Sequence, residues 1–323
     1  MIAALRTAYF WHRPLMILAA LMLLCALVSG IGVIVDPRDI LGAPAWAKPL
    51  KFSLSIFVYA ATWAWLIAHT PRWQRLTRAL GTAIAVTLAV EQVLIVWAAA
   101  TGTTSHFNVS TGVHVVVWAA MAVAITVMYL CTFVASVAVF SLRLPSPSLT
   151  LAVRAGAVIA LAGIGVAFLM TGPTEPQLTT PSGIVGAHAV GVADGGPGLP
   201  LLGWSTIAGD YRVAHFVGMH ALQALLAFAL VLRLVARRIP RLAAQTVQTR
   251  LVVAAVVAYA AAVMVLTVQA AAGQSVVRPD GVFLVAGWVI VAAFVVAVAG
   301  ICLRGGGSAS GRHPEPTPIT VPA

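Results

Sequence analysis

The chain has 323 residues, of which 61% are hydrophobic and only 8% are charged, and its mean hydropathy is +1.01. Such a composition excludes a soluble globular protein, whose surface must be largely polar, and predicts a membrane protein. The net charge of +11 does not indicate nucleic-acid binding, because the basic residues are scattered between apolar runs and form no basic stripe.

Eight apolar runs are long enough to cross a hydrocarbon core of about 30 Å as helices, which takes about 20 residues. In chain order they cover residues 14–35, 50–69, 79–100, 112–139, 154–171, 213–235, 250–271 and 282–303. The first run is too long for the apolar part of a signal peptide and is interpreted as a retained span. The sequence therefore predicts an all-α fold, a polytopic membrane helix bundle of about eight transmembrane helices within residues 1–303.

The placement of basic residues predicts the orientation of this bundle. With the N-terminus in the cytoplasm, 14 of the 19 basic residues fall on the cytoplasmic side, and six of the eight acidic residues fall on the other side. This is the pattern of the positive-inside rule, so both termini are expected in the cytoplasm.

Two segments lie outside the predicted spans. The extracytoplasmic segment 172–211 is rich in Gly and Pro, and a loop of this length is usually a functional lid or disordered. The tail 304–323 has nothing to bury and is expected to be disordered in the cytoplasm.

Polar side chains interrupt the predicted spans near one side of the membrane. On the helix 213–235, the step of 100° per residue places His215, His220 and Gln223 on one stripe. Glu91 lies at a matching depth on the helix 79–100, where a charge costs about 2.5–3.5 kcal/mol, so these groups must face protein or a water-filled cavity. We expect Glu91 to pair with His220 or Lys51.

The stripe and its neighbours define two sets of candidate residues. The candidate pocket consists of Glu91, Gln92, His114, Arg212, His215, His220 and Gln223. The candidate rim consists of Lys48, Lys51, His106, Asn108, His188, Asp210 and Gln269. Structural roles compete with these assignments: headgroup contacts for the cations, helix capping by Ser110 or Thr111 beside His114, and an interhelical polar clamp for the deep residues.

Cofactor binding is left open by the sequence. It has no HExxH or HxxxH zinc motif and no CxxCH motif for covalent haem. A metal would need ligands from several helices, among His114, His215, His220 and Glu91. Haem would take His114 with His215 or His220 as axial ligands. A metal-free hydrogen-bond network fits the same residues.

The polar groups favour a pocket that opens to the extracytoplasmic side. It would bind or process a small molecule or a lipid, whereas the inner halves of the spans lack the ionisable groups that a transport route usually needs. Two alternatives stay open: a solute or proton-coupled transporter that uses Glu91, and a haem- or metal-binding redox protein. The expected partners are the lipid bilayer and this ligand, with no nucleic acid.

Four stretches, WAKPLKF, TTSHFN, DGGPGLP and GDYRVAHFVGMHALQ, lie between Trp46 and Gln223. Together they resemble an uncharacterised family of multi-pass integral membrane proteins of bacteria. The resemblance implies a protein of the bacterial plasma membrane, the inner membrane, and carries no activity over to this chain.

Overall fold

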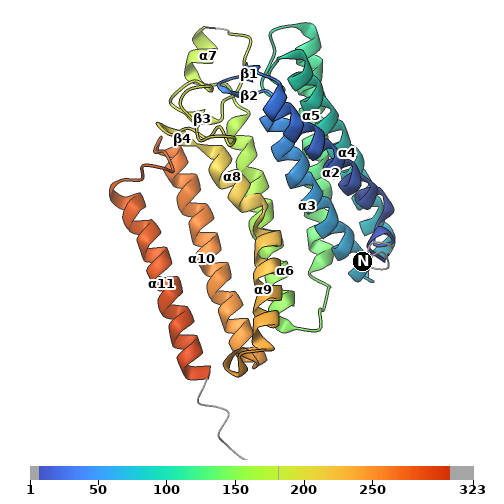
Figure 1. Cartoon of the computed structure of the whole chain (residues 1–323), viewed down its shortest axis with the longest axis vertical. Helices are drawn as coiled ribbons and strands as arrows, with labels where there is room; N and C mark the ends of the chain where they lie inside the picture. Colours follow the sequence, from blue (N-terminus) through green and yellow to red (C-terminus); the bar gives the residue numbers. More distant parts are fainter. Residues whose placement is uncertain (1–6, 181, 306–323) are drawn as a thin grey trace, which may run out of the picture.

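The computed structural model describes residues 7–180 and 182–305, and within them the chain forms a bundle of long helices (Figure 1). The all-α prediction is confirmed. The helices of the bundle are α2 (Arg13–Val35), α3 (Ala47–His69), α4 (Gln74–Thr101), α5 (Gly112–Val139), α6 (Pro147–Gly165), α8 (Tyr211–Met219), α9 (Ala221–Ala236), α10 (Gln245–Ala271) and α11 (Gly281–Gly305). Of the tail expected to be disordered, residues 304 and 305 belong to α11, and 306–323 lie outside the described residues.

Local signals in the sequence explain where several helices begin and end. The imidazole of His12 accepts a hydrogen bond from the backbone N–H of Leu15, and a proline follows in the first turn of α2. The hydroxyl of Thr111 caps α5 by accepting from the N–H of His114. Gly102 ends α4 with a left-handed φ of 72°, a conformation that glycine adopts without strain.

The sixth predicted span is broken, so the prediction of one continuous helix over 213–235 is wrong. α8 and α9 meet at a bend of 47° at His220, whose backbone N–H bonds to the carbonyl of Gly218. Backbone groups freed at such a bend need new partners inside a membrane. The hydroxyl of Tyr259 on α10 supplies one by donating to the carbonyl of Val217 at 2.7 Å.

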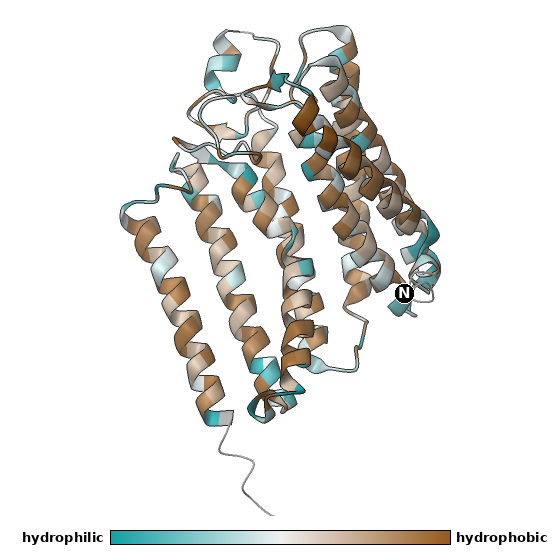
Figure 2. Ribbon diagram, viewed as in Figure 1, coloured by the Kyte–Doolittle hydropathy of each residue, from teal (hydrophilic) through white to brown (hydrophobic). Residues whose placement is uncertain are grey.

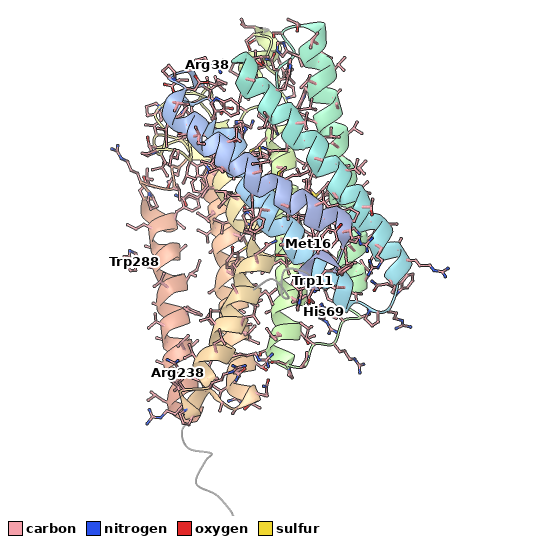
Figure 3. The ribbon with its side chains drawn as sticks, turned by 45° about the vertical axis from the view of Figure 1, so that its right-hand side comes forward. Trp11, Met16, Arg38, His69, Arg238 and Trp288 are labelled. Carbon is pink, nitrogen blue, oxygen red and sulfur yellow. The ribbon has the colours of Figure 1, made fainter. Side chains whose placement is uncertain are left out.

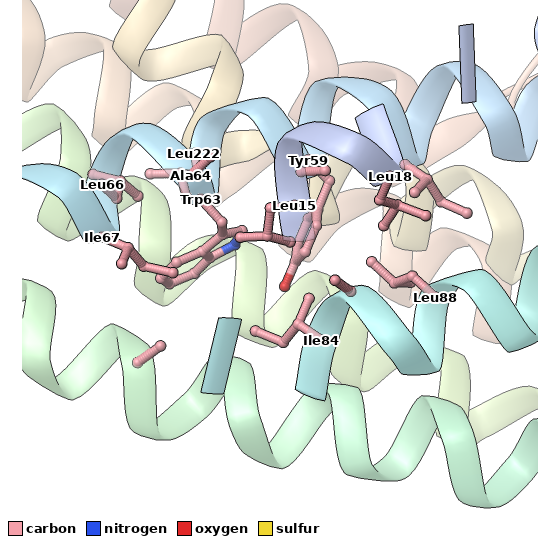
Figure 4. Packing of buried hydrophobic residues seen from close by; sticks show 14 of the residues in the cluster. Leu15, Leu18, Tyr59, Trp63, Ala64, Leu66, Ile67, Ile84, Leu88 and Leu222 are labelled. Carbon is pink, nitrogen blue, oxygen red and sulfur yellow. The ribbon is translucent and has the colours of Figure 1, made fainter. Parts of the chain in front are cut away.

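The helices form two groups that lie side by side. In the first group, α3 packs between α2 and α4, and α4 also contacts α5. Its core includes Leu15, Trp63 and Ile84, which Figure 4 shows in contact between α2, α3 and α4. In the second group, α6, α8, α9 and α10 pack on one another, and α11 packs mainly against α10.

The outer surface of the bundle suits a lipid environment. Apolar residues cover the lengths of the helices, and hydrophilic residues gather at the two ends (Figure 2). Trp288 on α11 is 68% exposed, whereas Arg38 and Arg238 lie at opposite ends of the bundle (Figure 3). Within the described residues, seven helices are long and apolar enough to cross a membrane, or eight if the bent pair counts as one span. These features indicate a multi-pass, membrane-embedded protein.

One end of the bundle, which we call the capped end, is covered by a folded segment of the chain (Figure 1). This segment contains η1 (Val166–Met170), α7 (Glu175–Thr179) and a two-stranded antiparallel sheet of β3 (Ala189–Val190) and β4 (Gly209–Asp210). A second small sheet pairs β1 (Asp39–Ile40) with β2 (Ala43–Pro44). The described chain begins and ends at the opposite end of the bundle.

Candidate functional site

A cavity of about 730 Å³ lies at the capped end, between the two helix groups. Side chains from α3, α4, α5 and α8 form its walls, together with the segment between η1 and β4, the hairpin of β1 and β2, and the loop after α4 that carries His106. Most of the lining is apolar, including Tyr59, Trp118, Ile125, Met128 and Phe216. Eight of the lining residues are ionisable in the ordinary pH range or permanently charged: Lys48, Lys51, Glu91, His106, His188, Asp194, Arg212 and His215.

His106 connects Lys48 to Glu91. Its Nδ1 atom lies 3.0 Å from Lys48 Nζ and 3.0 Å from Ser105 Oγ, and its Nε2 atom lies 3.4 Å from Glu91 Oε1. Because an ammonium group can only donate, Nδ1 accepts from Lys48 and Nε2 carries the proton that faces Glu91. Burial, followed by the charge of Lys48, lowers the pKa of His106 far below its ordinary value, so the imidazole is neutral.

Glu91 therefore has other neighbours than expected. The prediction that it pairs with His220 or Lys51 is wrong, because the loop after α4 brings His106 to its carboxylate, whereas His220 faces α3. The second oxygen, Oε2, is buried and has no hydrogen-bond partner within the described part of the chain. An unpartnered carboxylate oxygen is costly at membrane depth, so this oxygen is an unfavourable group in the cavity lining.

Lys51 is a cation without a carboxylate partner in the described residues. Its Nζ atom donates to the carbonyl of Leu202 at 2.7 Å, which leaves two further N–H donors. Lys48, one turn earlier on α3, also makes no carboxylate contact within ion-pair distance among the residues that the structure describes. The polar side of the cavity is therefore richer in available positive charge than in negative charge.

Arg212 is held in place by Asp210. Its Nε and Nη2 atoms donate to the carboxylate at 2.9 and 2.6 Å, and Nη2 also donates to the carbonyl of Gly203 at 2.6 Å. Asp210 caps α8 by accepting from the backbone N–H of Arg212, and it accepts from the N–H of Ser205. Asp210 does not line the cavity, whereas Arg212 does.

His188 pairs with Asp194 in the capping segment. The ring Nδ1 lies 2.6 Å from Asp194 Oδ2, and Asp194 also accepts from the backbone N–H groups of His188 and Ala189. The imidazole lies against the ring of Phe107, with centroids 4.9 Å apart and the ring planes tilted by 55°, and it lines the cavity.

The polar stripe predicted on the sixth span divides at the bend. His215 on α8 lines the cavity, and its Nδ1 donates to the carbonyl of Gly163 at 2.8 Å. His220, at the bend, contacts Ser55 Oγ of α3 at 2.8 Å through Nε2, and the side chain of Gln223 lies beside it. Neither His220 nor Gln223 lines the cavity.

Four further candidates lie outside the cavity. The amide of Gln92 donates to the carbonyl of Pro49 at 3.2 Å and to Ser53 Oγ at 3.0 Å, which links α4 to α3. Asn108 accepts from the backbone and hydroxyl of Ser110. His114 sits in the first turn of α5, with its Nδ1 2.8 Å from the capping hydroxyl of Thr111. Gln269 donates to the carbonyl of Ser275.

Two features of the cavity were missed by sequence reasoning. From the sequence, Asp194 counted only as one of the acidic residues outside the membrane, and its contact with His188 was not predicted. The available signal was its place six residues after a histidine, in a glycine-rich segment that can fold back on itself. The aromatic wall residues Phe107 and Trp118 carry no local signal that distinguishes them from lipid-facing aromatics.

The described residues do not form a metal-binding cluster. They contain no group of three or more His, Cys, Asp or Glu side chains that could hold a metal ion. His114, named as a haem or metal ligand with His215 or His220, is separated from the cavity that His215 lines.

The chain matches no protein-family model, no curated protein and no solved structure at a significant level.

Proposed function

We propose that the cavity binds an amphiphile with an anionic headgroup, which enters from the outer leaflet of the bacterial plasma membrane. The observation that carries this proposal is the charge of Lys51, which faces the cavity without a carboxylate partner among the described residues. Lys51 is partly buried, and an ammonium group in this position without an anion is unfavourable, so an anionic ligand would be stabilised there.

The rest of the lining supports an amphiphile rather than a small polar anion. The cavity volume of about 730 Å³ is within the usual range for sites that take small molecules. Its apolar part, with Tyr59, Ile125 and Met128, would hold a hydrocarbon chain, while Lys48, Lys51 and Arg212 would contact the headgroup. The orientation rests on the distribution of basic residues, which places the capped end outside the cytoplasm.

Anionic lipid binding can be measured directly. Native mass spectrometry of the purified protein with phosphatidylglycerol should show a bound lipid, and Lys51→Gln should weaken the apparent affinity about tenfold or more, the usual effect of losing a hydrogen bond to a charged group. Lys51→Arg keeps the charge and should keep most of the affinity. Arg72→Gln, at the opposite end of the bundle, serves as the control for lipid bound at the surface.

The proposal fails if Lys51→Gln and Arg72→Gln have equal effects, or if phosphatidylcholine binds as tightly as phosphatidylglycerol. The first outcome would locate lipid binding outside the cavity. The second would remove the role of the headgroup charge.

A transporter remains the second candidate, and the bend of 47° at His220 favours it. Broken helices near the middle of the membrane form substrate sites in many transporters. In this function Glu91 would be the protonatable group. Purified protein in liposomes should then move the ligand between the leaflets or across the membrane, and Glu91→Gln should abolish the movement while binding persists.

A further inference from the structure

The pairing of His188 with Asp194 fixes the position of the proton on the imidazole. A carboxylate can only accept hydrogen bonds, so the short contact to Asp194 requires the proton on Nδ1. The other ring nitrogen, Nε2, then carries a free lone pair. It has no hydrogen-bond partner in residues 7–180 and 182–305, and the side chain keeps 16% exposure where it lines the cavity.

The electrostatic surroundings favour a neutral imidazole beside an ionised carboxylate. Burial lowers the pKa of His188, the hydrogen bond to Asp194 offsets part of this effect, and the charges of Arg212 and Lys48 lower it again. Burial alone would raise the pKa of Asp194, but its hydrogen bonds from the ring and backbone of His188 and from Ala189 bring it well below its ordinary value. A general base must be in this protonation state before it accepts a proton.

We propose that His188 is a general base, oriented by Asp194, for the hydrolysis of a carboxylic ester in an anionic amphiphile. The inference rests on the proposed function, because the ester must be bound in the cavity. Such an amphiphile carries its ester at the junction of headgroup and chain, and His188 lies where the charged residues of the lining meet the aromatic wall at Phe107.

The reaction consumes one water molecule and needs no other reactant. His188 Nε2 takes a proton from water while the water oxygen forms a bond to the ester carbonyl carbon. The tetrahedral intermediate then collapses, the bond between that carbon and the alcohol oxygen breaks, and the alcohol oxygen takes the proton from Nε2. Lys48 and Arg212 line the same cavity as His188, and in this scheme their positive charges would stabilise the negative charge of the intermediate.

Asp194 is a positioning residue in this scheme. It also stabilises the capping segment by accepting hydrogen bonds from the backbone N–H groups of His188 and Ala189. Asp194→Asn separates the two roles. The amide oxygen can still accept from the backbone N–H groups, while the amide nitrogen would donate to Nδ1 and force the proton onto Nε2. This variant should fold as the parent does but should lack the base.

The test uses the full chain in nanodiscs that contain phosphatidylglycerol, in water enriched in ¹⁸O. The parent protein should release fatty acid that carries ¹⁸O in its carboxylate. His188→Gln and Asp194→Asn should both lower the rate about 100-fold or more, since a positioned general base typically contributes a factor of 10²–10⁴. His114→Gln, which lies outside the cavity, should leave the rate within twofold. In the parent, the rate should fall as the pH drops through the lowered pKa of His188.

Lipid binding, measured on the same samples, separates the two proposals. If phosphatidylglycerol binds in the cavity but no ¹⁸O-labelled fatty acid appears, or if His188→Gln and Asp194→Asn hydrolyse at the parent rate, the general-base proposal is wrong and the binding function stands. If phosphatidylglycerol does not bind, the proposed function itself is wrong.

Discussion

The backbone of Gly163 in α6 lies directly against the backbone of Gly218 in α8, so closely that a Cβ atom on either residue would overlap the other helix. The carbonyl of Gly163 accepts the hydrogen bond from His215 Nδ1 in the same contact. Small residues allow this kind of close approach between membrane helices. The glycine contact therefore sets the position at which His215 reaches the cavity.

Gly163→Ala should destabilise the protein by about 1–3 kcal/mol, because the added methyl group must push α6 and α8 apart. Thermal unfolding in detergent measures the effect. Gly287→Ala in α11 is the matched control, since nothing lies within 4 Å of a Cβ built at that position. Equal unfolding temperatures for the two variants would show that the helices separate without cost and that the contact is not tight.

Gln92→Leu should lower the free energy of unfolding by about 1 kcal/mol, since hydrogen bonds between membrane helices average ~0.6 kcal/mol and this amide makes two between α4 and α3. Anionic lipid binding should not change, because Gln92 does not line the cavity. Thr126→Ala is the control, since that hydroxyl bonds only to the carbonyl of Ala122 in its own helix. Loss of lipid binding in Gln92→Leu would contradict the assignment of a structural role.

Acidification from pH 7 to pH 5 should lower the unfolding temperature. Burial lowers the pKa of both His106 and His188 in the folded protein, whereas an unfolded histidine titrates near ~6.5. Below the pKa of the unfolded histidines, the unfolded chain binds more protons than the folded chain. The contribution of these histidines to stability is therefore present above that pKa and is lost as the pH falls through their lowered pKa values in the folded protein. His106→Gln and His188→Gln should each flatten this pH dependence. A higher unfolding temperature at pH 5 would contradict this sign.

The orientation can be tested by labelling single cysteines in a background where Cys25, Cys131 and Cys302 are replaced by Ala. Val192→Cys, in the exposed part of the capping segment, should react with a membrane-impermeant maleimide on intact cells. Arg241→Cys, in the turn after α9, should react only after the cells are permeabilised. The reverse pattern would place the capped end in the cytoplasm and would move the cavity opening to the inner leaflet.

The sequence by itself determined the helical, membrane-embedded character of the chain. A run of about 20 apolar residues has one stable arrangement across a bilayer, because every backbone polar group must bond within the segment. The helix α5, for example, begins and ends at the residues of the predicted run 112–139. The break at His220 could not be predicted in this way, because the contacts beside it, between Gly218 and α6 and from Tyr259 on α10 to Val217, come from distant parts of the chain.

Which polar residues meet in the cavity was decided only by the tertiary structure. Helical periodicity placed His215 and His220 on one stripe, yet the bend directs His215 to the cavity and His220 to Ser55, 165 residues earlier in the chain. Lys48 and His106 are 58 residues apart, and their contact depends on how α3 packs against the loop after α4. Periodicity fixes the direction of a side chain relative to its own helix axis, whereas the partner depends on helix packing and loop paths, which no local pattern encodes.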